Sequence, residues 1–193
     1  MAAALAIAGN VASGADESVR APEIVWLDTL DLTTMHQGWG EPQVKRSMRE
    51  KPLSLGGRKF EHGVGTHAVS NYRLKLAGGT QKFDATVGLD DAANGPGSII
   101  FQIVTDGKKV FDSGVMRTNT PAKEVSVDLR GVKSLVLTVT DAGDGIGYDH
   151  ADWADARFTV TGAKPDPLTP PREAPYVLTP KPRPAPRLNC PKV

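Results

Sequence analysis

Tryptophan, histidine and aspartate residues gather in three glycine-rich segments of the sequence. The first contains Trp39 (GWGEP), the second contains His67 (GVGTHA), and the third runs from Asp141 to Asp155 (DAGDGIGYDHADWAD). Aromatic rings can pack on the apolar C–H faces of sugars, while imidazoles and carboxylates form hydrogen bonds with hydroxyl groups. These residue types therefore indicate a site for a polyhydroxylated ligand.

The candidate carbohydrate contacts each offer an aromatic ring, an imidazole or a carboxylate, either in these segments or in the run GLDD (88–91) at the end of a predicted strand. They are Trp39, His67, Asp90, Asp91, Tyr148 and His150. A structural interpretation competes with this one, because a tryptophan beside a strand is often core and a histidine between small residues is often a buried hydrogen-bonding group. Both interpretations stay open at the level of sequence.

A metal hypothesis rests on the aspartates, because calcium takes several carboxylate and carbonyl oxygens and these acids lie in loops. The candidate ligands of a structural calcium ion are Asp28, Asp152 and Asp155. The alternative is that aspartates in glycine-rich turns cap backbone N–H groups, and their spacing does not match an EF-hand. Zinc is disfavoured because the histidines show no HExxH or comparable spacing, and the single cysteine excludes a cysteine cluster.

Catalysis has little support in the sequence. Glycoside hydrolysis usually needs two carboxyl groups roughly 5–10 Å apart on opposite sides of the scissile bond. Asp90 and Asp91 are neighbours at the end of a strand, so their side chains are expected to point to opposite faces. No nucleophile-elbow pattern surrounds a serine. We therefore expect a binding chain rather than an enzyme.

The elements that must position these residues are short β-strands separated by turns. Strands are predicted over residues 70–76, 83–87, 99–104, 110–111, 125–129, 135–139 and 157–160, from apolar alternation or apolar runs. Turn residues such as Asp106-Gly107 bound them, and no window shows helical periodicity. This pattern predicts an all-β fold, an antiparallel β-sandwich of the jelly-roll kind.

The predicted domain covers residues 23–162, and both ends differ from it in composition. Residues 1–22 contain a short apolar run that resembles a truncated signal peptide, which favours a secreted or periplasmic protein. Residues 163–193 hold most of the fifteen prolines and are expected to be a semi-rigid spacer to another domain. The net charge of +1 without a basic run argues against nucleic acid, and no apolar stretch is long enough for a membrane span.

The same segments resemble the NPCBM family of carbohydrate-binding modules, which has a galactose-binding-like jelly-roll fold. The matching stretches follow the family's order and cover about 140 residues: WLDTLD (26–31), GWGEP (38–42), GVGTHA (63–68), FDATVGLDD (83–91), GSIIFQIV (97–104), FDSGV (111–115) and LTVTDAGDGIGYDHADWADARF (137–158). The last stretch is long and distinctive, so the match is specific to the family.

The resemblance implies a non-catalytic module, appended to a secreted glycoside hydrolase such as an α-galactosidase. It also implies binding of galactose-containing or related glycans and a bound calcium ion. We expect a monomer that is covalently linked to a catalytic domain. Two alternatives remain: a structural or protein-interaction sandwich of a multidomain enzyme, and a fragment of an α-galactosidase-like hydrolase.

Overall fold

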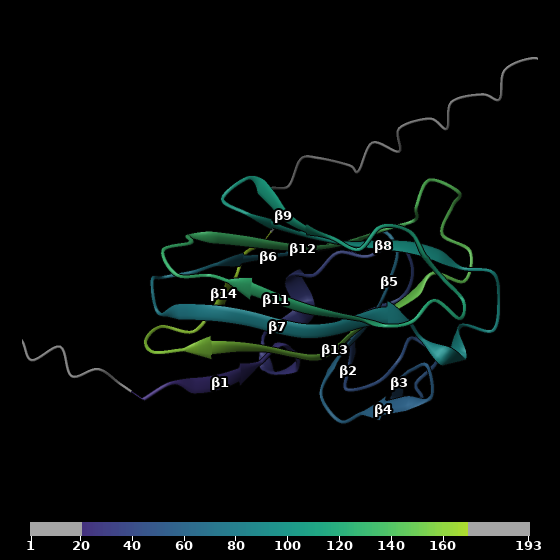
Figure 1. Ribbon diagram of the computed structural model, residues 1–193, viewed down its shortest axis with the longest axis horizontal. Coiled ribbons are helices and arrows are strands. Elements are labelled where there is room, and N and C mark those ends of the chain that lie inside the picture. Colours follow the sequence, from purple (N-terminus) through teal and green to yellow (C-terminus); the bar gives the residue numbers. More distant parts are fainter. Residues whose placement is uncertain (1–20, 170–193) are drawn as a thin grey trace, which may run out of the picture.

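The computed structural model describes residues 21–169 as two antiparallel β-sheets packed face to face (Figure 1). The first sheet has the order β11-β7-β13-β5-β2, with β1 also paired to β13. The second has the order β10-β8-β12-β6-β14, with β9 also paired to β8. A two-stranded sheet, β3-β4, lies beyond the first sheet. The predicted antiparallel β-sandwich is therefore confirmed.

The first sheet contains β1 (Glu23–Trp26), β2 (Gln43–Val44), β5 (Gly63–His67), β7 (Thr80–Leu89), β11 (Lys123–Asp128) and β13 (His150–Val160). The second contains β6 (Ser70–Lys75), β8 (Ser98–Thr105), β9 (Lys108–Asp112), β10 (Met116–Arg117), β12 (Ser134–Thr140) and β14 (Asp166–Pro167). The small sheet is β3 (Leu53–Leu55) and β4 (Arg58–Phe60), and three short 3-10 turns are η1 (Leu27–Thr29), η2 (Leu32–Thr34) and η3 (Asp91–Ala93).

The core lies between the two sheets and follows from alternation along the strands. In β12 every second side chain is buried, and β6 and β8 repeat the pattern, because successive side chains of a strand point to opposite faces. Trp153 of β13 is fully buried, with its ring 4.9 Å from Phe101 of β8 and nearly perpendicular to it. This tryptophan is thus a core residue that joins the sheets.

Strand β13 positions most of the candidate site. It pairs with β7 and β5 on its two sides, and its second half also pairs with β1. The sequence predicted a strand only from residue 157, but β13 begins at His150. Polar residues such as Asp152 break the apolar pattern there, yet they are buried because the strand is central in the sheet.

The sandwich also extends past the predicted boundary at residue 162. β14 pairs with β6, and the N–H of Leu168 donates to the carbonyl of Arg73. Pro167 is tolerated because β14 is an edge strand. The predicted leader and most of the predicted proline-rich spacer lie outside the described residues 21–169. Within that range, no helix is long and apolar enough to cross a membrane.

Candidate functional site

Three aromatic side chains meet at one end of the first sheet. The ring of Trp39 lies 5.4 Å from that of His67 and 6.2 Å from that of His150, measured between ring centroids. The two imidazoles are 5.1 Å apart and nearly perpendicular. The indole is 53% exposed, whereas both histidines are only 4% exposed. We call these three residues the aromatic trio.

Strand register brings the two histidines together. His67 ends β5 and His150 begins β13, and the two residues are direct antiparallel partners. Directly opposed residues of an antiparallel pair have Cβ atoms about 4.5–5.5 Å apart, so their side chains share one face of the sheet. The central position of both strands holds this half of the trio firmly.

Trp39 comes from the loop between η2 and β2, and Gln37 fixes that loop. The Gln37 amide donates to the carbonyl of Trp39 at 2.8 Å, and its oxygen accepts from the Thr66 hydroxyl at 2.7 Å. Gly38 lies so close to the backbone of Ala68 that a Cβ atom there would collide with it. The tryptophan loop is therefore attached directly to the end of β5.

Both imidazoles are neutral at pH 7. Burial lowers the pKa of His67. Burial lowers the pKa of His150 to about 4, with further contributions from His67 and the nearby charge of Arg49, which outweigh the opposing effect of Asp90. Nδ1 of His67 lies 2.7 Å from the carbonyl oxygen of Ala68 and must donate to it, because a carbonyl can only accept. Nε2 of His67 is therefore an acceptor.

Hydrogen-bonding capacity also remains on His150. Its Nδ1 is buried and has no partner among the described residues. Unpaired buried polar groups are uncommon in folded proteins, and they often mark a place where a ligand or water binds. The trio thus combines an exposed apolar ring with neutral imidazole groups that can donate to or accept from hydroxyls.

Tyr148 is also exposed, at 47%, but its ring packs against Gly95 in the loop between η3 and β8. Its φ of +66° turns the chain just before Asp149 and His150. The described ring contacts join Trp39, His67 and His150 and do not include Tyr148. Tyr148 borders the trio in sequence, and its contact with sugar stays a prediction.

Asp90 and Asp91 serve the scaffold. The Asp90 carboxylate is 2% exposed and accepts from the N–H groups of Ala92 and Ser54. Asp91 accepts from the Ser54 hydroxyl at 2.5 Å, and from the N–H groups of Gly56 and Gly57 at 2.8 Å each. These bonds fasten the turn between β3 and β4 to the end of β7. The structure gives both predicted sugar contacts a holding role, so we leave them out of the proposed ligand contacts.

The three predicted metal ligands have separate surroundings. Asp28 accepts from the N–H of Gly63 at 2.7 Å and lies 3.0 Å from Nδ1 of His62. Asp155 lies 3.5 Å from the guanidinium of Arg58. Across residues 21–169, no three histidine, cysteine, aspartate or glutamate side chains are arranged to hold a metal ion. Asp28, Asp152 and Asp155 are therefore not gathered into one cluster among the described residues, and their role as calcium ligands stays a prediction.

Asp152 has a different partner, the carboxyl group of Asp90. Both of its oxygens are buried without a hydrogen-bond donor. Burial and the neighbouring Asp90 raise the pKa of Asp152 well above its usual range. Two carboxyl groups in contact need a shared proton or a bridging cation, because two buried like charges repel. Among the predicted metal ligands, Asp152 thus has both oxygens free for a cation or a proton, and Asp28 has one, Oδ1.

Sequence reasoning missed Gln37 and Arg49. Gln37 fixes the tryptophan loop, and the charge of Arg49 acts on His150. Both lie outside the glycine-rich segments, and a glutamine or arginine in a polar loop has no distinguishing pattern. The proximity of Gln37 to GWGEP was the only signal that could have identified it.

Comparison with known proteins gives a consistent result. The model of the NPCBM/NEW2 domain matches residues 23–159. Alpha-1,3-galactosidase B of Akkermansia muciniphila is 35% identical over 136 residues, which are 68% of this chain and 17% of that protein. The chain thus spans about a sixth of that relative's length.

Solved structures show the same likeness. The CBM51 module of Clostridium perfringens GH95, in complex with methyl-galactose, superposes with a TM-score of 0.67 at 35% identity, covering 71% of this chain and 100% of that chain. CBM51-2 from Clostridium perfringens ZmpB, in complex with GlcNAc, has a TM-score of 0.67 at 31% identity, and the match covers 74% of this chain and 33% of that chain. These likenesses confirm the galactose-binding-like β-sandwich. Because the family model spans the sandwich from β1 to the end of β13, the chain belongs to the NPCBM/NEW2 domain family.

Proposed function

We propose that this chain is a non-catalytic carbohydrate-binding module whose sugar ligand packs on Trp39. The observation that carries the proposal is the aromatic trio, in which a half-exposed indole adjoins two neutral imidazoles. An exposed tryptophan offers an apolar surface for one face of a sugar ring. The imidazoles supply the hydrogen bonds that orient the ring.

Each residue of the trio has a distinct role in this proposal. Trp39 provides the stacking surface, and Nε2 of His67 accepts a hydrogen bond from a sugar hydroxyl. His150, whose ring lies beside those of Trp39 and His67, supplies a second polar contact. Because both imidazoles are neutral, their contacts with sugar carry no charge-desolvation cost at pH 7.

The proposed ligand class is a galactose-containing or related glycan. A similar module binds methyl-galactose and another binds GlcNAc, so the fold supports recognition of more than one sugar. The relative from Akkermansia muciniphila is a galactosidase and carries the matching segment as a small part of its length. We propose that the module acts as a monomer and directs an attached, secreted glycoside hydrolase to its substrate.

The direct test is glycan-array screening followed by calorimetry with methyl-galactose. Trp39→Ala should lower the affinity about twofold to tenfold, because stacking on an aromatic ring contributes on the order of 0.5–1.5 kcal/mol. Val110→Ala, which truncates another exposed apolar side chain on β9, is the matched control. If no glycan binds the folded wild type, the alternative of a structural or protein-interaction sandwich replaces the proposal.

Calcium remains a separate proposal. The unpaired buried oxygens of Asp152, in contact with the carboxyl of Asp90, are the chemistry that supports it. An ion there would bind a buried pair of carboxyl groups and would stabilise the fold. A shared proton explains the same pair, so a metal-removal experiment distinguishes the two.

A further inference from the structure

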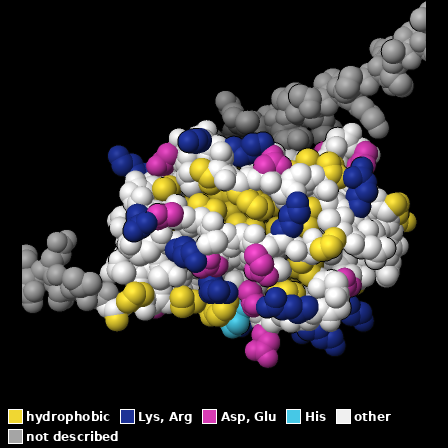
Figure 2. Space-filling view, viewed as in Figure 1, with side chains coloured by type: hydrophobic (Ala, Val, Ile, Leu, Met, Phe, Trp, Pro, Cys, Tyr) yellow, Lys and Arg dark blue, Asp and Glu magenta, His cyan; other side chains and the backbone are white. Residues whose placement is uncertain are grey.

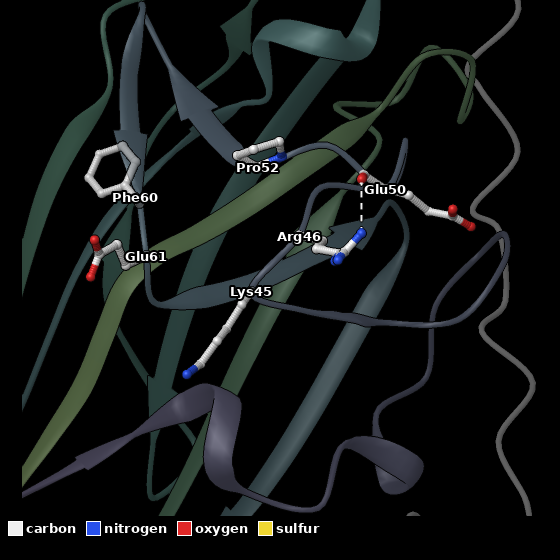
Figure 3. A pocket seen from close by; sticks show the side chains of 6 residues that line it. All are labelled: Lys45, Arg46, Glu50, Pro52, Phe60 and Glu61. Carbon is white, nitrogen blue, oxygen red and sulfur yellow. Dashed lines mark hydrogen bonds between the residues drawn. The ribbon is translucent and has the colours of Figure 1, made fainter.

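A hollow lies between the loop 45–52 and the end of β4, and it has no part in the proposed function. Its volume is about 410 Å³, within the range of small-ligand pockets. Its lining is Lys45, Arg46, Glu50, Pro52, Phe60 and Glu61. Figure 3 shows Lys45 and Arg46 on one side and Phe60 and Glu61 on the other, with the Glu50 carboxylate extending away from the rest. The hollow is therefore lined by two cations, by two glutamates, of which Glu50 points away, and by an apolar floor of Pro52 and Phe60.

The two cations that line the hollow form no close ion pair within residues 21–169. Among the described residues, no carboxylate lies within 4.0 Å of the Lys45 ammonium or the Arg46 guanidinium. Arg46 reaches only the main-chain carbonyl of Glu50, at 3.4 Å.

The segment around the hollow is also basic as a whole. Residues 41–61 hold six lysines and arginines against three glutamates, an excess of three positive charges in a chain whose net charge is +1. Figure 2 shows lysine and arginine side chains gathered at the lower right of that face, where Figure 1 places β3 and β4. This corner of the molecule thus carries several of the positive charges on that face.

The hollow and the trio lie on the same face of β5. A Cβ atom at Gly65 would meet the backbone of Arg46 and Ser47, so the loop 45–52 covers that face. His67 is two residues further along the strand and points to the same face, about 7 Å away. Arg49, on the same loop, is close enough for its charge to act on His150. A ligand on Trp39 could extend from the trio toward this loop.

We propose that the loop 45–52 forms an anion-binding subsite for glycans that carry a carboxylate or a sulfate group. The neutral sugar ring packs on Trp39, and its charged substituent, or a charged neighbouring sugar, reaches Lys45 and Arg46. The apolar floor of Pro52 and Phe60 contacts the C–H surface of that second group. This inference rests on the proposed function, because it takes the ligand to be a glycan bound at the trio.

The test compares three ligands by calorimetry: methyl-galactose, galactose 6-sulfate and a sialylated galactoside. At low salt (about 20 mM), an anionic ligand should bind wild type about threefold to tenfold more tightly than methyl-galactose, since exposed ion pairs contribute ~0.2–1 kcal/mol each. At about 500 mM salt the advantage should disappear. Lys45→Gln/Arg46→Gln should abolish it while leaving methyl-galactose binding unchanged.

The matched control is Lys108→Gln/Arg117→Gln, which removes the same charge from exposed positions on β9 and β10 of the other sheet. This control variant should still bind the anionic ligands more tightly than methyl-galactose at low salt. A gain with only the sulfated or only the sialylated ligand supports the inference and identifies the group. The inference is overturned if all three ligands bind wild type with equal affinity, or if both double variants lose the advantage of the anionic ligand equally. Either result leaves the proposed function intact. If methyl-galactose itself does not bind, the proposed function fails.

Discussion

Replacing His150 by glutamine should flatten the dependence of the free energy of unfolding on pH. The pKa of His150 is lowered from 6.5 to about 4 in the folded protein, so the unfolded chain binds a proton more readily across this window. Stability from the neutral imidazole is therefore present above pH 6.5 and is lost as the pH falls toward 4. Glutamine cannot titrate, so the variant lacks this loss.

The magnitude follows from the same values. A pKa difference from 6.5 to about 4 corresponds to about 3 kcal/mol at ~1.36 kcal/mol per pKa unit. The indole edge of the trio is open to solvent, and screening there should reduce the effect to about 1–2 kcal/mol. Wild type should lose that much more stability than His150→Gln between pH 7 and pH 4.5.

The assay is urea unfolding at five pH values for wild type, His150→Gln and the control His36→Gln. His36 is an exposed histidine outside the trio, so its replacement should leave the wild-type slope unchanged. Parallel curves for wild type and His150→Gln would refute the reasoning, because they would mean that His150 titrates alike in the folded and unfolded states. The same measurement in methyl-galactose should show weaker binding toward pH 4, where His150 becomes charged.

Three further perturbations separate scaffold roles from ligand roles. Asp149→Asn should raise the free energy of unfolding at pH 8 by about 1–2 kcal/mol relative to wild type. Burial raises the pKa of Asp149 to about 7, so wild type loses the stability of the protonated form as the pH rises through that value. A wild type that is equally stable at pH 5 and pH 8 would contradict this. Asp91→Ala should lower the free energy of unfolding by about 1–3 kcal/mol and speed amide hydrogen exchange at Gly56 and Gly57, whose N–H groups lose their acceptor. The affinity for methyl-galactose should not change. A loss of affinity without a loss of stability would show that Asp91 contacts the ligand. If calcium bridges Asp152 and Asp90, EDTA should lower the melting temperature by several degrees, since a ligand at 100 times its Kd stabilises the folded protein by about 2.7 kcal/mol. An unchanged melting temperature would support the shared proton.

The strands of the second sheet could be predicted from sequence because one face of each is buried. Alternation along β6, β8 and β12 follows directly from that geometry. The first half of β13 could not be predicted in the same way. Its polar residues, Asp152 among them, are buried by neighbours on both sides, and such burial has no local signature.

The residue types of the candidate site could be predicted from the sequence, but their arrangement could not. Trp39, His67 and His150 were chosen for their chemistry, and the structure brings all three together. Asp90 and Asp91 had equally suitable chemistry, yet turns in the backbone use their oxygens. Strand pairing distinguishes the two groups, because the contact of His67 with His150, which are far apart in the sequence, depends on register.

The contrast between two tryptophans is the strongest argument that the trio binds a ligand. Trp153 is fully buried and joins the sheets, so the core already has its large aromatic residue. Trp39 gains little from folding, since half of its surface stays in water, yet Gln37 and the close approach at Gly38 hold its loop in place. Ordering a loop to keep an indole exposed costs conformational entropy without burying the ring. A sugar ring that covers the indole would supply the missing burial, and the two fixed imidazoles beneath it would set its orientation.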